Sequence, residues 1–456
     1  MLTVRDFIPQ FFIIALFLAV GMLFNSSVQS FAQEDDAEKK NGAVNIAQSI
    51  FDEPAEGQGK DLRDVIPGPP RGETVLTRPR PETDAIGIPV QGFLFFPTLA
   101  IEQIYDQNIF LTEDGKENDL ITTYNPGLKL TSDWNNHMLN FKAEALIGRY
   151  AQVNNENYED LNVSIDGRID VARETFLFGI LDFAKLHENR GSPSDTGSGS
   201  PTQYNVTTAA IELFHKINRL SLTFDLGQTF FNFYDSAPLV NQDDRDRTKS
   251  AVSLRAAYEI VPKYEAFVRL EGNDVSYDSG PDDIGLDRDS HGYEAVAGVE
   301  ADFDGIIFGE VLAGYRQQFF GDPNLEDINT LIFGGGLKWN VTNLTTISGD
   351  IKNNLHETTS AASGLVSTVY TVAVDHELLR NLLLNVNFDF TYDRYEGGTY
   401  QEADKYGAGF NAHYLMNRYF DVNFSYKYKT KNADREGGGD RDYKSHIIAL
   451  RLNAKI

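Results

Sequence analysis

Long stretches in which apolar and polar residues alternate are the feature that most restricts the fold of this sequence. Within residues 382–392 every second residue is apolar, and Asn, Asp and Thr fill most positions between them. The same pattern runs through residues 406–414 and 420–428. Since successive side chains of a β-strand point to opposite faces, each stretch predicts a strand with one apolar and one polar face.

Alternation alone also fits a soluble β-sandwich, so the connections between the strands decide the class. Strand-like stretches of roughly 12 to 15 residues, enough to cross a bilayer at a tilt, are joined in turn by short turns and longer polar loops. The short turns fall at residues 133–137, 173–174, 217–219, 261–263, 304–305, 341–343, 379–381 and 417–419, and the loops include residues 188–202, 235–247, 278–289, 320–328 and 433–440. This asymmetry is typical of outer-membrane barrels, whose turns face the periplasm and whose loops face outward.

The strand number follows from the connections: eight short turns and nine loops make 17 connections, which join 18 strands. They predict an all-β fold, a closed antiparallel up-and-down transmembrane β-barrel of about 18 strands (16 to 18). An even strand number leaves both chain ends on the periplasmic side. Residues 119–133 form the weakest strand, because Pro126 and Gly127 favour a bulge or a split there.

The first 92 residues do not share the strand pattern. Arg5, an apolar stretch over residues 11–24 and a small residue at Ala32 form the layout of a secretory signal peptide. The apolar stretch is shorter than the roughly 20 residues of a membrane-spanning helix. The following residues are acidic and then rich in proline, which predicts a largely disordered chain. The sequence thus divides into a signal peptide (1–32), a periplasmic lead-in (33–92) and an outer-membrane β-barrel (93–456).

Composition excludes several other classes. No apolar run after residue 32 reaches the length of a membrane helix, so a role in a membrane has to use strands. The chain has no cysteine, which rules out a disulfide framework, whereas barrel closure would pair every strand edge. The net charge of −27 argues against nucleic acid as a partner.

No catalytic, cofactor-binding or metal-binding set of residues is predicted, and we expect no enzyme activity. The Asp-rich stretches 243–247 and 282–289 contain interleaved arginines and lack the glycine spacing of a calcium loop. His187 and His376 each neighbour a glutamate but belong to no hydrolase or zinc motif.

The predicted functional surface is the lumen of the barrel. With polar faces taken as inward, the candidate pore-lining residues are Arg255, Arg269, Glu271, Glu300, Arg316, Asp389, Lys427 and Lys429. Acidic and basic residues in one lumen can create a transverse electric field that selects solutes. Alternatively, they can pair with one another and so cross-link the strands.

Short motifs spread along the chain add a resemblance. They include Arg78-Pro79-Arg80-Pro81-Glu82, Tyr105-Asp106-Gln107-Asn108, His187-Glu188-Asn189-Arg190-Gly191 and Asp375-His376-Glu377-Leu378. In order and spacing, over about residues 78–456, they resemble the putative beta-barrel porin type 2 family. The resemblance implies an outer-membrane location and a porin role, often beside polysaccharide export genes, and it brings no catalytic or ligand residues.

The preferred hypothesis is a porin-like channel for passive or selective diffusion of small hydrophilic solutes in the outer membrane of a Gram-negative bacterium. One alternative is an outer-membrane component of an exopolysaccharide or capsule export or envelope-assembly system, with partners docking on residues 33–92. Another is a soluble exported β protein. The expected partners are outer-membrane lipid and lipopolysaccharide, the outer-membrane assembly machinery, and a small hydrophilic solute or polysaccharide.

Overall fold

The computed structural model describes residues 73–192, 195, 199–236, 241–398, 401–435 and 442–456. The predicted signal peptide and most of the predicted lead-in lie outside these ranges. Within them, no helix is both long and apolar enough to span a membrane.

The described residues are mostly in long strands. The strands are β1 (Ile88–Val90), β2 (Phe93–Asp106), β3 (Asp119–Ser132), β4 (Met138–Tyr150), β5 (Tyr158–Ala172), β6 (Thr175–His187), β7 (Gln203–Ile217), β8 (Leu220–Phe233), β9 (Arg247–Val261), β10 (Tyr264–Tyr277), β11 (Ser290–Phe303), β12 (Ile307–Phe320), β13 (Ile328–Thr342), β14 (Thr345–His356), β15 (Gly364–Leu379), β16 (Leu382–Glu396), β17 (Gln401–Leu415), β18 (Phe420–Arg435) and β19 (Tyr443–Lys455). Two short 3-10 helices, η3 (Asn154–Glu156) and η4 (Asp243–Arg245), lie in connections.

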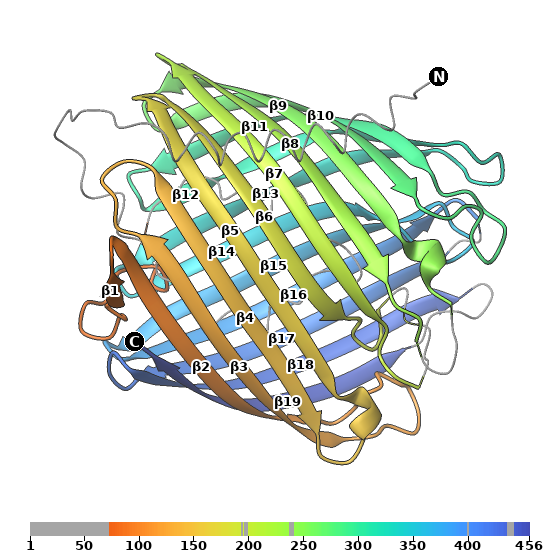
Figure 1. Cartoon of the computed structure of the whole chain (residues 1–456), viewed down its shortest axis with the longest axis horizontal. Coiled ribbons are helices and arrows are strands. Elements are labelled where there is room, and N and C mark those ends of the chain that lie inside the picture. Colours follow the sequence, from red (N-terminus) through yellow and green to blue (C-terminus); the bar gives the residue numbers. More distant parts are fainter. Residues whose placement is uncertain (1–72, 193–194, 196–198, 237–240, 399–400, 436–441) are drawn as a thin grey trace. The chain divides into compact units, whose positions relative to one another are not determined.

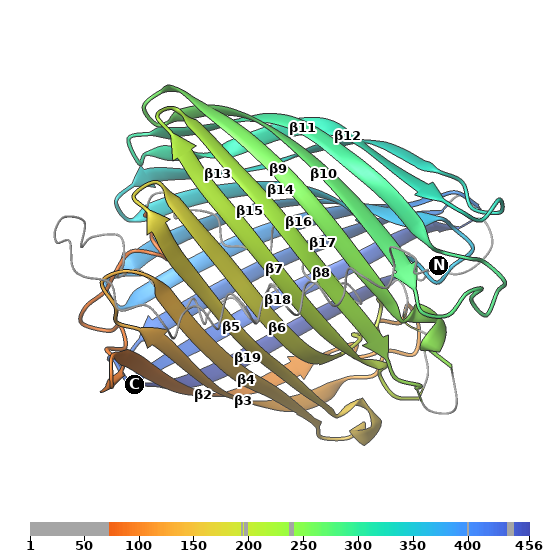
Figure 2. The ribbon, with the colours of Figure 1, turned by 45° about the horizontal axis from the view of Figure 1, so that its top comes forward.

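Strands β2 to β19 form a closed antiparallel barrel of 18 strands, in which tilted strands follow one another around a ring (Figures 1 and 2). Each strand pairs with the next in sequence, and β19 closes the ring on β2, with Leu450 opposite Gln103. The predicted up-and-down barrel is confirmed. Closure leaves no edge strand in the ring, so its backbone hydrogen bonds are satisfied without water.

Strand β1 extends the sheet beyond the predicted start of the barrel. β19 pairs with residues 98–106 of β2, whereas β1 pairs with Phe93–Phe95. Gln91 and Gly92 join β1 to β2 with positive φ angles of 46° and 84°, as a two-residue hairpin turn requires. The first hairpin therefore begins at Ile88, inside the predicted lead-in.

The connections differ in length between the two ends of the barrel. Eight connections of two to five residues, such as residues 173–174 and 304–306, lie at one end, here called the turn end. Nine connections lie at the other end, the loop end, and all of them except residues 397–400 are seven residues or longer. Asp304 and Gly305 have φ angles of 54° and 72°, a left-handed backbone that Asp and Gly tolerate and that a tight turn needs. Strand β3 is continuous, but its pairing with β4 skips Asn125 and Pro126, because proline has no N–H to donate.

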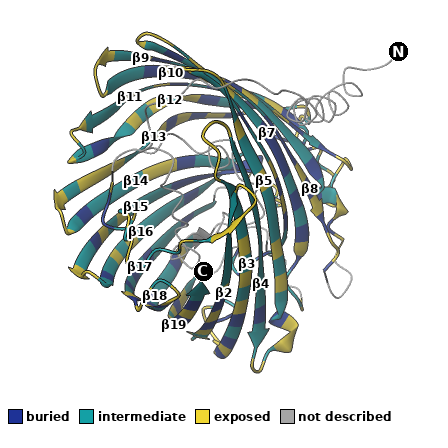
Figure 3. Cartoon of the chain, turned by 60° about the vertical axis from the view of Figure 1, so that its left-hand side comes forward, coloured by how far each residue is buried: buried dark blue, intermediate teal, exposed yellow. Residues whose placement is uncertain are grey.

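The two faces of each strand differ in polarity, and bands of different exposure alternate along the strands (Figure 3). On β16, Val386 and Phe388 are 53% and 49% exposed on the outside, whereas Asn387 and Asp389 line the interior. A soluble β protein buries its apolar face within the fold, but this chain turns it outward. Such an outer surface requires a lipid environment.

Candidate functional site: the lumen of the barrel

The barrel encloses a cavity of about 1310 Å³. Nine Lys and Arg residues and ten Asp and Glu residues line it, together with many Asn, Ser and Thr side chains. The lining is thus close to neutral although the chain carries a net charge of −27. A polar, nearly neutral interior is suited to water and hydrophilic solutes.

The structure places the eight predicted pore-lining residues in two groups. Those that line the cavity are Glu271, Arg316, Asp389, Lys427 and Lys429. Arg255, Arg269 and Glu300 also point inward, from β9, β10 and β11, but are not among the residues that line the cavity. Arg255 pairs with Glu300 at 3.2 Å, and its guanidinium lies 4.3 Å from the centre of the Phe267 ring.

Charge pairing cross-links the wall formed by β10, β11 and β12. The carboxylate of Glu294, of which only 3% is exposed, accepts from Arg269 at 2.7 Å and from Arg316 at 2.8 Å. Glu294 stands opposite Arg316 in the strand register and opposite Glu271 on the other side. A buried carboxylate shared by two arginines ties three strands together and fixes the wall at this level.

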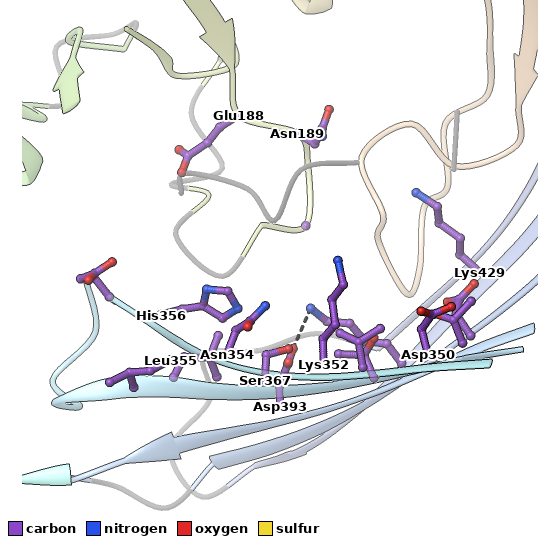
Figure 4. A pocket seen from close by; sticks show the side chains of 18 of the residues that line it. Glu188, Asn189, Asp350, Lys352, Asn354, Leu355, His356, Ser367, Asp393 and Lys429 are labelled. Atoms are coloured by element: carbon purple, nitrogen blue, oxygen red, sulfur yellow. Dashed lines mark ion pairs between the residues drawn. The ribbon is translucent and has the colours of Figure 1, made fainter. Parts of the chain in front are cut away.

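At the loop end, residues 188–191 fold into the lumen. Glu188 accepts hydrogen bonds from both terminal nitrogens of Arg245 at 3.0 and 2.5 Å, and Arg245 also lies over the ring of Phe233. Residues 188–191 line the cavity, and Figure 4 shows Glu188 and Asn189 on the opposite side from Lys352. This loop therefore narrows the passage.

A second buried pair holds the same loop. Arg190 donates to Glu156 of η3 at 2.8 and 2.6 Å, and it also pairs with Asp195 at 3.2 Å. The charged side chains of this loop are thus balanced by the residues that anchor it. Nothing in the sequence pattern predicted these ion-pair partners.

Residues 357–363 also turn inward at the loop end. Lys249 contacts the carboxylate of Glu357 at 2.8 Å, and Arg247 lies 3.8 Å from it. Burial disfavours the charged form, but Lys249 and Arg247 outweigh it and lower the pKa of Glu357 to about 2. Arg288 joins this loop to the connection at residues 278–289 by donating to the backbone oxygens of Ser360 and Ala362.

At the turn end, the first residues of segment 73–86, here called the inner segment, enter the lumen. Arg78 and Arg80 both donate to Glu377 of β15, at 2.8 and 3.1 Å. Arg80 also donates to the backbone oxygen of Val75, which holds the segment in a turn. The sequence marked these arginines only as part of a motif, because charged partners almost 300 residues apart leave no local pattern.

Apolar contacts and backbone hydrogen bonds seat the inner segment. Val75 packs with Leu383 and Leu415, and its N–H donates to Thr346 Oγ1 at 3.0 Å. Thr74, Leu76 and Thr77 line the cavity. The last part of the predicted lead-in therefore narrows the lumen from the turn end.

The other sequence motifs have structural partners. His187 pairs with Asp160 at 2.9 Å and stacks on Tyr158, and His376 bonds Thr345 Oγ1 at 3.0 Å. Asp282, in one of the Asp-rich stretches, pairs with Arg288 at 2.7 Å. Across the described residues, no cluster of three or more His, Asp or Glu residues is arranged to hold a metal ion.

A closed barrel that is apolar outside and polar inside is a transmembrane β-barrel of the outer-membrane class, and the cell outer membrane is its location. The outward apolar face rules against the soluble alternative. The chain belongs to the family described as Putative beta-barrel porin 2, whose model matches residues 80–456. The resemblance seen in the sequence motifs is confirmed.

Comparison with solved structures finds other outer-membrane barrels. Pseudomonas aeruginosa OccK2 (OpdF) aligns at 10% identity and a TM-score of 0.46, over 80% of this chain and 100% of that one. Acinetobacter baumannii OccAB3 aligns at 10% identity and a TM-score of 0.43, over 79% and 99%. P. aeruginosa OpdK with vanillate aligns at 11% identity and a TM-score of 0.44, over 79% and 99%. No curated protein matches the sequence.

Proposed function

We propose that this protein is a channel for the diffusion of small hydrophilic solutes across the outer membrane. The observation that carries the proposal is a polar cavity of about 1310 Å³ inside a closed barrel of 18 strands. Barrels of this size leave an aqueous passage unless it is filled. Here residues 188–191 and the inner segment narrow the passage from opposite ends, as expected for a selective channel rather than a wide one.

Conductance in planar lipid bilayers tests this function. Purified, refolded protein should give discrete current steps, and folding is verified by a shift in gel migration on heating. Correctly folded protein that adds no current at any voltage would contradict the proposal. Liposome swelling in arabinose provides a second readout, because a neutral solute enters without a contribution from charge.

We also propose that the turn end faces the periplasm and the loop end faces the outside. Both ends of the barrel chain lie at the turn end, and the predicted signal peptide would deliver them from the periplasmic side. A cysteine introduced at Asn324, in the connection after β12, should react with a membrane-impermeant maleimide in intact cells. Labelling only after the outer membrane is opened would reverse the orientation.

The proposed partners follow from the apolar outer surface of the closed barrel. The outward apolar residues would contact lipid and lipopolysaccharide, and insertion of a closed barrel would use the outer-membrane assembly machinery. Depletion of that machinery should lower the amount of heat-modifiable protein in the membrane fraction. An unchanged amount would show that insertion follows another route.

A further inference from the structure

The inner segment lies against an apolar spot on a wall that is otherwise mostly polar. At the turn end, two inward positions of β16 and β17 hold Leu383 and Leu415, whereas Asn385 and His413 occupy the next inward positions of the same strands. Both leucines are buried, and Val75 packs against them. An apolar side chain that faces an aqueous lumen is stabilised when another apolar group covers it. The wall thus offers a site that the inner segment fills.

The same wall holds the backbone of the segment. The buried hydroxyl of Thr346 on β14 accepts from the N–H of Val75 at 3.0 Å and donates to Asn340 Oδ1 on β13 at 2.7 Å. Asn340 in turn donates through Nδ2 to the backbone oxygen of Glu73 at 2.7 Å. In peptide recognition, hydrogen bonds to the main chain supply affinity and side-chain pockets supply specificity. The residues that hold the segment in these two ways, together with the acceptor of its arginines, are here called the seat: Asn340, Thr346, Glu377, Leu383 and Leu415.

The inner segment has internal turns of its own. Thr74 N donates to Thr77 Oγ1 at 2.9 Å, and Thr77 N donates to Thr74 Oγ1 at 3.2 Å. The N–H of Arg80 donates to the carboxylate of Asp84 at 2.5 Å, and two prolines of the segment have fixed φ angles. A segment that keeps its shape loses little conformational entropy on docking. It can therefore leave the seat and return as a unit.

A seated segment occupies part of the lumen. Thr74, Leu76 and Thr77 line the cavity, and they flank the Val75 side chain that rests on the two leucines. Because these residues belong to one turn, loss of the Val75 contact should withdraw all of them from the passage.

We infer that the seat is a peptide-binding site, and that its occupation by the inner segment holds the channel in a low-conductance state. Release of the segment widens the turn end and gives a high-conductance state. This inference rests on the proposed function and adds the regulation of the same lumen. The ligand of the seat is a short peptide with a small apolar residue followed by arginines, and the chain itself supplies it.

Single-channel recording of the full-length protein tests the two states. Val75→Asp places a charge against two leucines, so this variant should stay at a conductance roughly twofold or more above the main level of the wild type. Ile86→Asp, at a position of the same segment that is 61% exposed, is the matched control and should keep the wild-type levels. A Val75→Asp channel with the wild-type levels would overturn the inference.

Peptide binding measured without a current separates this inference from the proposed function. A fluorescent peptide with the sequence of residues 73–86 should bind detergent-solubilised full-length Val75→Asp protein roughly tenfold more tightly than the same peptide carrying Val75→Asp. Equal binding of the two peptides would refute the seat even if the channel conducts. Conversely, a silent channel that still discriminates between the peptides would contradict the channel and support the seat.

Discussion

The two ends of the barrel use the same chemistry, an arginine on a carboxylate, in different surroundings. At the loop end, the side chains of Glu188, Arg245, Glu156 and Arg190 are each 7% exposed or less. At the turn end, Glu377, Arg78 and Arg80 are 12%, 33% and 11% exposed, so these side chains are less buried and Arg78 reaches water. Breaking a buried pair leaves a charge that water cannot reach, whereas a partly exposed pair is replaced by hydration.

This difference separates a fixed constriction from a removable one. Residues 188–191 are anchored by ion pairs that are costly to break, so they should narrow the lumen at all times. The inner segment is held by a few apolar contacts and by pairs near the open end. It should be displaced far more easily.

The largest effect is expected from Arg245→Ala. It leaves the Glu188 carboxylate buried without its main partner, which should destabilise the docked loop by about 3–5 kcal/mol. The loop should then leave the lumen, so that single-channel conductance rises and trypsin cleaves after Arg190 in folded protein.

A double variant provides the control for this prediction. Glu188→Gln with Arg245→Met removes both charges and should keep most of the loop in place, because neither partner remains charged in a buried site. Equal conductance for the single and double variants would show that burial of the pair does not determine the position of the loop.

A smaller effect is expected from Glu377→Ala at the turn end. Loss of the carboxylate removes two charge-assisted hydrogen bonds, a change of about 2 kcal/mol, but both arginines can turn towards water. Hydrogen exchange should accelerate in residues 73–86 and stay unchanged in the barrel strands. Glu82→Gln, at an exposed position of the same segment, is the matched control. If exchange in the segment is as slow as in the wild type, Glu377 is not its anchor.

The smallest effect concerns pH at the loop end. The pKa of Glu357 is lowered from 4.5 to about 2, so pairing with Lys249 stabilises the docked loop fully above about pH 4.5. The contribution is lost as the pH falls towards 2. Hydrogen exchange in residues 357–363 should therefore rise below about pH 4 in the wild type, whereas Glu357→Gln should exchange faster at neutral pH and lose this dependence. A wild-type loop whose exchange follows only the intrinsic pH trend would disprove the pairing.

Much of the fold could be predicted from the sequence, because each strand repeats its own signal. The alternation in residues 382–392 gave both the strand and its faces, and Asp304–Gly305 marked a turn. Strand number then followed from counting turns, since the chain visits the strands in order around the ring.

The lumen could be predicted only in part. Alternation identifies an inward face but not which inward residue on a nearby strand is the partner, so the pairing of Arg255 on β9 with Glu300 on β11 could not be predicted. The inward position of residues 188–191 and of the inner segment depends on contacts such as Arg78 with Glu377, which only the closed barrel brings together. The alternation on β18 predicted Lys427 and Lys429 as inward residues, and both line the cavity.

The inner face of the barrel meets water while the outer face meets lipid. The chain has no cysteine, so single cysteines on β15 provide a clean test. Thr371 lines the cavity, and its neighbour Val372 is 51% exposed on the outer face. Thr371→Cys should react with a negatively charged, membrane-impermeant methanethiosulfonate and lose part of its current, whereas Val372→Cys should remain unmodified in the bilayer. Reaction at Val372→Cys, together with an inert Thr371→Cys, would show that the inner face is not the one that meets water.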